Sequence, residues 1–187
     1  MILILIGKTC AGKTTIRDLL KEKGFDEVVT YTTRPKREGE IDGKDYHFIS
    51  DEEFINKIHS GFFAEYKTYN TVKGLWYYGT SRESLEEAEG DKVIILTPDG
   101  LSDLEGSISV PIFSVYIYAN NRSIQTRLKD RGDNPLEIDR RIKTDNEDFL
   151  GAERKVNKIV YNNIGTKLDD IVDKILGFYN EWRDAIK

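Results

Sequence analysis

Residues 2–14 read Ile2-Leu3-Ile4-Leu5-Ile6-Gly7-Lys8-Thr9-Cys10-Ala11-Gly12-Lys13-Thr14. The apolar run at 2–6 predicts a strand that is buried on both faces of a sheet. The residues from Gly7 onward fit the pattern G-x-x-x-x-G-K-[ST], in which glycines let successive backbone N–H groups point at phosphate oxygens. A helical pattern follows over about 13–23, and the positive N-terminal end of that helix adds to the attraction for anions. Together these features predict a site for the phosphates of a nucleoside triphosphate.

Each part of this loop has an expected role. The Lys13 ammonium would bridge the two terminal phosphates, and the Thr14 hydroxyl would ligate the Mg²⁺ that accompanies ATP. The residues expected to contact ATP here are Gly7, Lys8, Thr9, Cys10, Ala11, Gly12, Lys13, Thr14 and Thr15. The loop predicts the phosphoryl donor and leaves the acceptor open.

The remaining pattern predicts an α/β fold. Further strands are expected at 28–31, 93–96, 113–118 and 158–161, and further helices at 51–58, 81–89, 122–131, 136–149 and 168–182. Apolar strands that alternate with helices favour a parallel sheet flanked by helices. Residues 32–80 break this rhythm and predict an inserted, mobile subdomain, and the segment around 122–142 predicts a second mobile piece.

Composition excludes several classes of protein. A chain of 187 residues suits one core better than two full domains. The net charge of −5 argues against a nucleic-acid polymer as partner. No apolar run approaches the roughly 20 residues that span a bilayer, so no membrane association is expected. Cys10 is the only cysteine, which rules out an intrachain disulfide and favours a reducing, cytoplasmic setting. Either a monomer or a homodimer is compatible with the sequence.

A second anion site is predicted in the segment 32–48. Arg34 and Arg37 lie three residues apart, and their guanidinium forks match the oxygens of a phosphate dianion. Tyr46 can donate its phenolic O–H to the same phosphate, and the glycines at 39 and 43 mark turns that bring it back toward the arginines. A plain basic surface loop is the alternative interpretation.

This segment closely resembles the GMP-binding segment of guanylate kinases, and the resemblance extends from Ile2 to about Ile175. It implies a P-loop nucleoside monophosphate kinase whose parallel sheet is flanked by helices, with an inserted mixed α/β subdomain and a helical lid. The implied core is 1–31, 81–120 and 150–187, the monophosphate-binding subdomain is 32–80, and the lid is 121–149. The implied reaction moves the γ-phosphoryl group of MgATP onto GMP or dGMP.

The resemblance also implies how the acceptor base is recognised. In the family, a glutamate after an aromatic-rich strand accepts hydrogen bonds from guanine N1 and N2, and Glu65 takes that position. A base with an acceptor at this place would leave the carboxylate unpaired, so discrimination can be large. The expected GMP-binding residues are Thr30, Arg34, Arg37, Tyr46, Glu65, Tyr78, Thr80 and Asp99.

Arginines near the predicted lid are the remaining candidates. Arg127 and Arg131 lie four apart on a predicted helix and share one face. Residues 128–132 and 138–142 resemble lid segments of the family, in which Arg131 and Arg141 would stabilise the transferring phosphoryl group. A mixed-charge surface is the alternative. The expected catalytic residues are Lys13, Arg34, Arg131 and Arg141, and Arg127 and Asn162 complete the expected ATP-binding residues.

The chain departs from the family pattern at three places. Thr97 stands where an aspartate usually begins an Asp-x-Asp run, with Asp99 in place of the second aspartate. Thr30 replaces a serine, and Asn70 to Leu75 adds a few residues. Three alternatives stay open: a kinase of this fold with another nucleotide or a sugar phosphate as acceptor, a non-catalytic interaction module, and a P-loop NTPase that acts on water.

Overall fold

The computed structural model describes residues 1–71, 74–86 and 90–187. A five-stranded sheet in the order β2-β7-β1-β8-β9 forms the core, and its pairings are parallel. Its strands are β1 (Ile2–Ile6), β2 (Asp26–Glu27), β7 (Lys92–Ile95), β8 (Ile112–Tyr118) and β9 (Lys158–Tyr161). β1 lies at the centre with all five side chains buried, which confirms the predicted strand.

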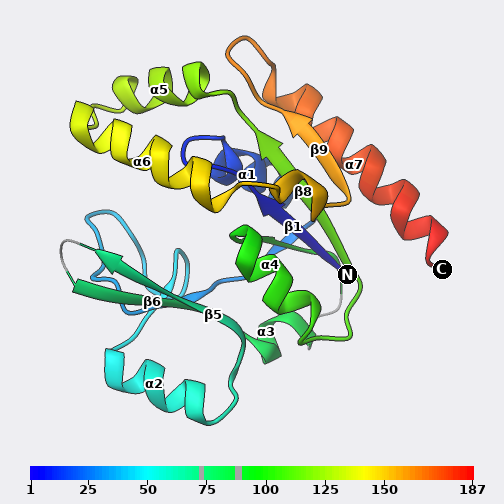
Figure 1. The fold of residues 1–187 in the computed structure, drawn as a ribbon. Helices are drawn as coiled ribbons and strands as arrows, with labels where there is room; N and C mark the ends of the chain where they lie inside the picture. The colour runs from blue at the N-terminus through cyan, green and yellow to red at the C-terminus, as the bar shows by residue number, and fades with distance from the viewer. Residues whose placement is uncertain (72–73, 87–89) are drawn as a thin grey trace.

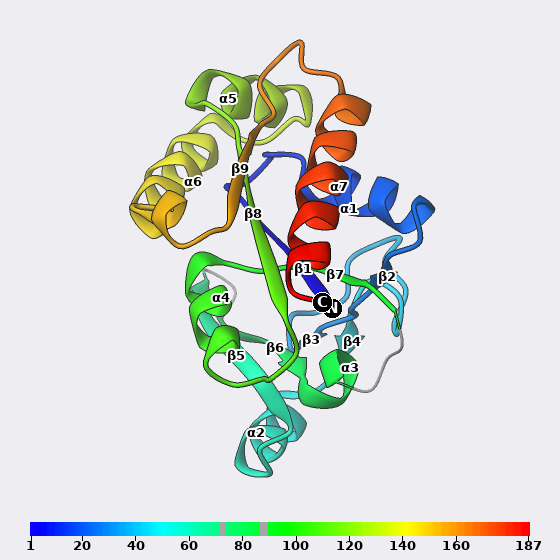
Figure 2. The same ribbon diagram turned by 90° about the vertical axis from the view of Figure 1, so that its right-hand side faces the viewer.

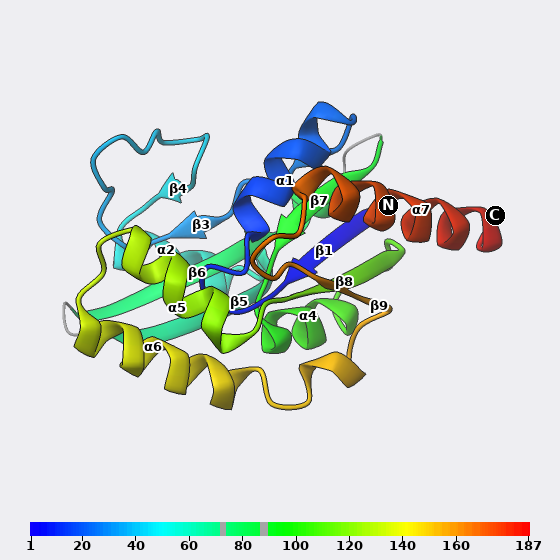
Figure 3. The same ribbon diagram turned by 90° about the horizontal axis from the view of Figure 1, so that it is seen from above.

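Helices cover both faces of this sheet (Figure 3). They are α1 (Lys13–Glu22), α3 (Arg82–Glu86), α4 (Pro98–Glu105) and α7 (Leu168–Ala185), with a 3₁₀ turn at Ala152–Arg154. Alternate residues of β1 point to opposite faces. Leu3 and Leu5 therefore pack in one core with α1 and α7, and Ile4 packs in a second core with α3 and α4. This arrangement confirms the predicted α/β class.

A second, mixed sheet lies beside the core sheet (Figures 1 and 2). Its order is β4-β3-β6-β5, with β3 and β4 parallel and the other pairs antiparallel. Its elements are β3 (Tyr31–Thr32), β4 (His47–Phe48), α2 (Asp51–His59), β5 (Phe63–Thr71) and β6 (Gly74–Ser81). Ser50 caps α2 by accepting a hydrogen bond from the Glu53 N–H. This mixed α/β unit occupies the predicted insertion.

Helices α5 (Asn121–Asp130) and α6 (Pro135–Asp148) lie next to one another on the phosphate-loop side of the core sheet (Figure 1). Asn120 caps α5 by accepting from the Ser123 N–H at 2.8 Å. A turn at Gly132, whose φ of 85° suits glycine, reverses the chain between the two helices. The segment that the sequence assigns to a lid is therefore an antiparallel helix pair.

Some elements differ from the expected ones. The expected strand at 28–31 is replaced by the short strands β2 and β3 on either side of Val28. Helix α4 was not expected from the sequence. Proline is favoured in the first turn of a helix, and Thr97 caps α4 by accepting from the Gly100 N–H at 3.1 Å. The expected helix at 81–89 is described only as far as Glu86, and part of the extra segment 70–75, residues 72–73, lies outside the described residues. Within the described part of the chain, no helix is both long and apolar enough to cross a bilayer.

Candidate active site

The loop between β1 and α1 curls where side chains would not fit. A Cβ on Gly7 would lie 2.6 Å from the Ile117 carbonyl oxygen, and a Cβ on Gly12 would lie 2.3 Å from the Asn162 amide nitrogen. Gly12 also has a φ of 94°, which favours glycine. These close approaches explain why the loop needs glycine at both positions.

Two side chains hold the loop through its carbonyl groups. Arg127 Nη1 donates to the Cys10 carbonyl at 3.0 Å, and Asn162 Nδ2 donates to the Ala11 carbonyl at 2.8 Å. Arg127 Nη2 also donates to the backbone and side-chain oxygens of Asn162, at 2.9 and 3.1 Å. Asn162 is only 2% exposed. The structure thus places Arg127 and Asn162, which the sequence assigns to ATP binding, against the loop backbone. Their contact with ATP stays a prediction.

The Lys13 ammonium lies at the centre of the site. Its Nζ donates to the carbonyls of Gly7 and Lys8 at 2.6 and 2.9 Å. Burial lowers the pKa of Lys13 to about 8, and the charge of Asp145 opposes this shift. An anion next to the ammonium would offset its desolvation.

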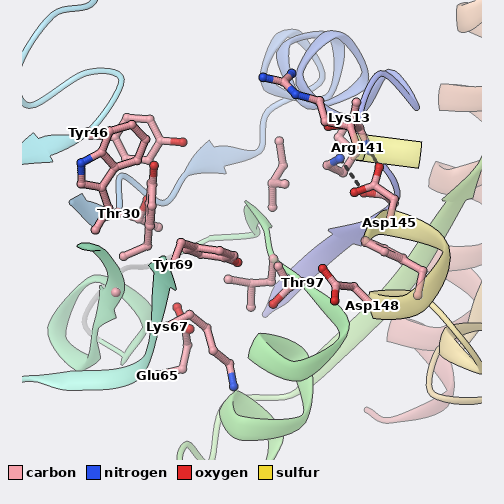
Figure 4. Close-up of a pocket in the computed structure, with 18 residues that line it drawn as sticks. Lys13, Thr30, Tyr46, Glu65, Lys67, Tyr69, Thr97, Arg141, Asp145 and Asp148 are labelled. Atoms are coloured by element: carbon pink, nitrogen blue, oxygen red, sulfur yellow. Dashed lines mark hydrogen bonds between the residues drawn. The ribbon is translucent and has the colours of Figure 1, made fainter. Parts of the chain in front are cut away.

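Lys13 lines several cavities, and two of them contain most of the predicted site residues that are accessible. The first, of about 500 Å³, lies between the second sheet, the core and α6 (Figure 4). Its wall includes the predicted site residues Gly7, Thr9, Lys13, Thr30, Tyr46, Glu65, Tyr78 and Arg141. The second, of about 460 Å³, includes Cys10, Gly12, Lys13, Thr14, Thr15, Arg127, Arg131 and Asn162. Half of the residues predicted for the acceptor therefore line the first cavity, and most of those predicted for ATP line the second.

Glu65 supplies a buried carboxylate to the first cavity. It is 7% exposed, and its Oε1 accepts a hydrogen bond from the Thr80 hydroxyl at 2.5 Å. Burial raises the pKa of Glu65 to about 7, while the Thr80 hydrogen bond works in the opposite direction. Its Oε2 lies 3.4 Å from where a Cβ on Gly100 would stand, so the first turn of α4 passes close to the carboxylate.

Strand β5 brings two further side chains to this cavity. Lys67 and Tyr69 follow Glu65 at alternate positions, and all three line its wall. Lys67 pairs with Asp103 of α4 at 2.8 Å. Burial raises the pKa of Tyr69, and the nearby Thr97 side chain partly opposes the shift. Sequence reasoning missed Lys67 and Tyr69, although the two-residue period after Glu65 was the available signal.

Arg34, one of the two predicted phosphate arginines, lies behind the cavity wall. Arg34 is 4% exposed and donates from Nη2 to Glu40 Oε1 at 2.6 Å. The rings of Tyr46 and Phe48 lie 5.4 and 5.6 Å from its guanidinium carbon. Glu40 Oε2 accepts from the backbone N–H of Arg37 at 2.7 Å, and the Arg34 hydrogen bond lowers the pKa of Glu40. Glu40, which sequence reasoning missed, therefore organises this segment.

Arg37 and Asp99 are both exposed, and neither lines the two cavities. Asp99 lies in the first turn of α4, next to Thr97, which does line the acceptor-side cavity. Contact of Arg37 or Asp99 with an acceptor stays a prediction. Thr80 is buried behind Glu65, where it positions the carboxylate.

Helix α6 contacts the loop from the other side. Asp145 Oδ2 accepts from the Thr9 N–H at 2.6 Å, and Asn146 Oδ1 accepts from Lys8 Nζ at 2.5 Å. Burial raises the pKa of Asp145, against the opposing effects of the Thr9 N–H and Lys13. The Asp145 carboxylate thus accepts the hydrogen bond of the Thr9 N–H, a loop donor that the sequence assigns to phosphate.

Comparisons with known proteins agree with this geometry. A family model described as guanylate kinase matches residues 1–179. The chain is 32% identical over 183 residues to a guanylate kinase of Clostridium tetani, covering 94% of this chain and 83% of that protein. It is 33% identical over 183 residues to a guanylate kinase of Caldanaerobacter subterraneus, with 94% and 84% covered. The crystal structure of guanylate kinase from Anaplasma phagocytophilum shares the fold, with a TM-score of 0.72, 21% identity, and coverage of 97% of this chain and 85% of that one.

Proposed function

Because the chain belongs to the guanylate kinase family of ATP-dependent nucleotide kinases, we propose that it transfers the γ-phosphoryl group of ATP to GMP or dGMP. The single observation that carries the proposal is the position of Lys13, which lines both the cavity of the phosphate loop and the cavity that contains Glu65. A phosphoryl group that passes between the two cavities would stay within reach of this ammonium.

The acceptor-side cavity suits a guanine base. Glu65 presents a carboxylate there, held by Thr80, and guanine carries two neighbouring N–H donors on one edge. Adenine would place a hydrogen-bond acceptor opposite the same carboxylate and leave the buried charge without that partner. Such a mismatch discriminates strongly between the two bases. Thr30 lines the same cavity and offers a hydroxyl to the base, as the resemblance implies.

The acceptor phosphate would lie near Tyr46 and Tyr78, which line the cavity. Arg34 lies directly behind Tyr46 and donates to Glu40 and to the Pro35 carbonyl, so only part of its five N–H donors would serve a phosphate. We treat residues 32–80 as the monophosphate-binding subdomain and 121–149 as the lid. Their closure would bring Arg34, Arg37 and Arg141 onto the phosphates and exclude water.

ATP is expected with Mg²⁺ in the second cavity. Thr14 lines this cavity at the start of α1, where its hydroxyl can ligate the ion. Mg²⁺ at such sites takes most of its ligands from substrate phosphates and water, so a single protein hydroxyl fits it. Among the described residues, no group of three His, Cys, Asp or Glu could hold an ion by itself. When bound, Mg²⁺ would offset phosphate charge during transfer.

Transfer would be direct and in line, without a covalent intermediate. The acceptor phosphate is already anionic, so the protein needs no general base. Lys13, Arg131 and Arg141 would compensate charge on the transferring group, and the cavity walls would position the two nucleotides.

A coupled assay of ADP formation tests the proposal. MgATP is supplied with GMP, dGMP, AMP, CMP, UMP or dTMP, and Lys13→Met serves as the inactive control. Phosphorylation of GMP or dGMP far above the other monophosphates is expected. Preference for another acceptor, or ATP hydrolysis unaffected by any monophosphate, would overturn it. Absence of ATP binding in calorimetry would indicate an interaction module instead.

A further inference from the structure

One carboxylate connects the two lid arginines. Asp133 lies in the turn between α5 and α6, and its side chain is 14% exposed. Its oxygens accept from Arg131 Nε at 2.8 Å and Arg131 Nη2 at 2.5 Å, a two-pronged contact. Oδ2 also accepts from Arg141 Nη1 at 3.3 Å. The Asp133 hydrogen bonds raise the pKa of the Arg131 guanidinium.

The two arginines belong to different cavities. Arg131 ends α5 and lines the cavity that contains Thr14, and Arg141 lies on α6 and lines the cavity that contains Glu65. Asp133 therefore joins a cation from the donor side to a cation from the acceptor side, across the turn that connects their helices.

The shared carboxylate helps if both guanidinium groups bind the same phosphoryl group. Two guanidinium groups repel each other, and each long side chain loses about 2 kcal/mol of rotamer entropy when it is fixed. A shared carboxylate offsets the repulsion and fixes both. The contact uses two of the five N–H donors of Arg131, so three remain for phosphate oxygens.

We propose that Asp133 is a positioning residue that holds Arg131 and Arg141 in the mutual arrangement needed for phosphoryl transfer. The inference rests on the proposed function of the site as a phosphoryl-transfer centre. Asp133 acts through the arginines and touches neither nucleotide. Arg131 is 52% exposed, but Asp133 is 14% exposed and has partners on two separate helices, which distinguishes the contact from a single exposed ion pair, whose removal usually changes little.

The opposite role is a specific rival. Asp133 could compete with phosphate for the arginines, so that its removal would strengthen nucleotide binding. Positioning and competition predict changes of opposite sign, and a purely structural role predicts loss of stability without a selective loss of turnover.

The test compares Asp133→Asn and Asp133→Glu with Asp130→Asn, an exposed acid at the end of α5, as matched control. Asp133→Asn should lower kcat at least tenfold, because small misplacements of catalytic groups cost up to roughly 10²-fold. KM for both substrates and the melting temperature should stay close to those of the wild type. Asp133→Glu should recover part of kcat, and Asp130→Asn should behave like the wild type.

A double variant keeps the inference falsifiable. Arg131→Ala combined with Asp133→Asn should be no slower than Arg131→Ala with Arg141→Ala, because the carboxylate acts only through these two residues. The inference would be overturned if Asp133→Asn left kcat unchanged or lowered KM for ATP. It would also be overturned if adding Asp133→Asn to a protein that already carries Arg131→Ala and Arg141→Ala lowered kcat further. Each assay uses the acceptor that the wild type phosphorylates fastest. If the wild type phosphorylates no acceptor, the rate of ATP hydrolysis is measured instead. A failure of guanine specificity is thereby distinguished from a failure of this inference.

Discussion

The Thr80 hydroxyl donates a 2.5 Å hydrogen bond to the Glu65 carboxylate across the antiparallel strands β5 and β6. The strand register places the two residues directly opposite each other. A carboxylate that would otherwise be buried without a partner is thus oriented before any base arrives, and its other oxygen remains for a ligand.

Replacing this carboxylate by an amide should remove guanine recognition. Glu65→Gln keeps the size of the side chain but sets an N–H₂ donor or a single weaker acceptor against two guanine donors. We expect kcat/KM for GMP to fall by roughly 10²-fold or more, since unpaired buried polar groups discriminate strongly. KM for ATP, measured in the same assay, should change little. Equal loss with every acceptor would indicate general damage to the site.

The use of GMP should depend on pH through the same residue. Guanine needs the ionised carboxylate, and burial raises the pKa of Glu65 to about 7. Below that pH, kcat/KM for GMP should fall by about tenfold per pH unit, because binding must first expel the proton. Phosphate monoesters also titrate near pH 6, so the profile of Glu65→Gln between pH 5.5 and 8.5 supplies the baseline. Identical profiles for the two proteins would rule out Glu65 as the titrating group.

The raised pKa of Glu65 also predicts a stability effect in the ligand-free protein. Between its ordinary value of 4.5 and about 7, the folded state binds more protons than the unfolded state. The free energy of unfolding should therefore decrease as pH rises through this window, by about 3 kcal/mol at most. Glu65→Gln should be more stable than the wild type at pH 8 and close to it at pH 4.5. Urea unfolding at the two pH values measures the difference, and greater stabilisation at the lower pH would contradict it.

The packing of the second sheet predicts a steric effect at Gly79. A Cβ there would lie 2.9 Å from ring atoms of both Phe54 and Phe63. Gly79→Ala should therefore cost about 1–3 kcal/mol of unfolding free energy, as overpacked cores do. Gly177→Ala is the matched control, because nothing lies within 4 Å of a Cβ at this position in α7. It should stabilise the protein by up to about 1 kcal/mol. A Gly79→Ala protein as stable as the wild type would show that the rings can move aside.

The contact between Asp145 and the phosphate loop predicts competition with ATP. The carboxylate accepts from the Thr9 N–H at 2.6 Å, so an incoming phosphate meets both an occupied donor and a like charge. Asp145→Ala should lower the dissociation constant of MgATP several-fold in calorimetry, on the scale of about 1 kcal/mol for such a contact. Asp139→Ala, an exposed position on the same helix, is the control. Weaker binding by Asp145→Ala would show that the carboxylate supports the nucleotide.

The sequence was informative wherever a local pattern determines the structure. The run 2–14 predicted β1, the loop and α1 because burial and loop geometry depend on neighbouring residues. Of the extra segment 70–75, the described residues belong to β5, which ends at Thr71, and to β6, which begins at Gly74. Helix α4 was missed because the same proline can stop one helix or begin another, and only the Thr97 cap decides between them.

Partners from distant or turn positions could not be predicted in the same way. Glu40 and Asp133 each pair with arginines that the sequence marked as phosphate ligands, yet acids beside arginines looked like ordinary mixed charge. The pairing depends on how each turn closes. Similarly, the approach of Asn162 to Ala11 joins residues far apart in the chain, and no local pattern encodes it.

The hairpin β5–β6 has a consequence for how such a protein could change its substrate. Glu65, Lys67 and Tyr69 lie on one strand of the hairpin, whereas the loop that surrounds Lys13 is built from β1 and α1. Reading a nucleobase and handling a phosphate are thus separable tasks in this architecture. A hairpin of different length, or with different side chains toward the cavity, could replace β5–β6 and change the base that is bound. The phosphoryl chemistry at Lys13 would stay the same.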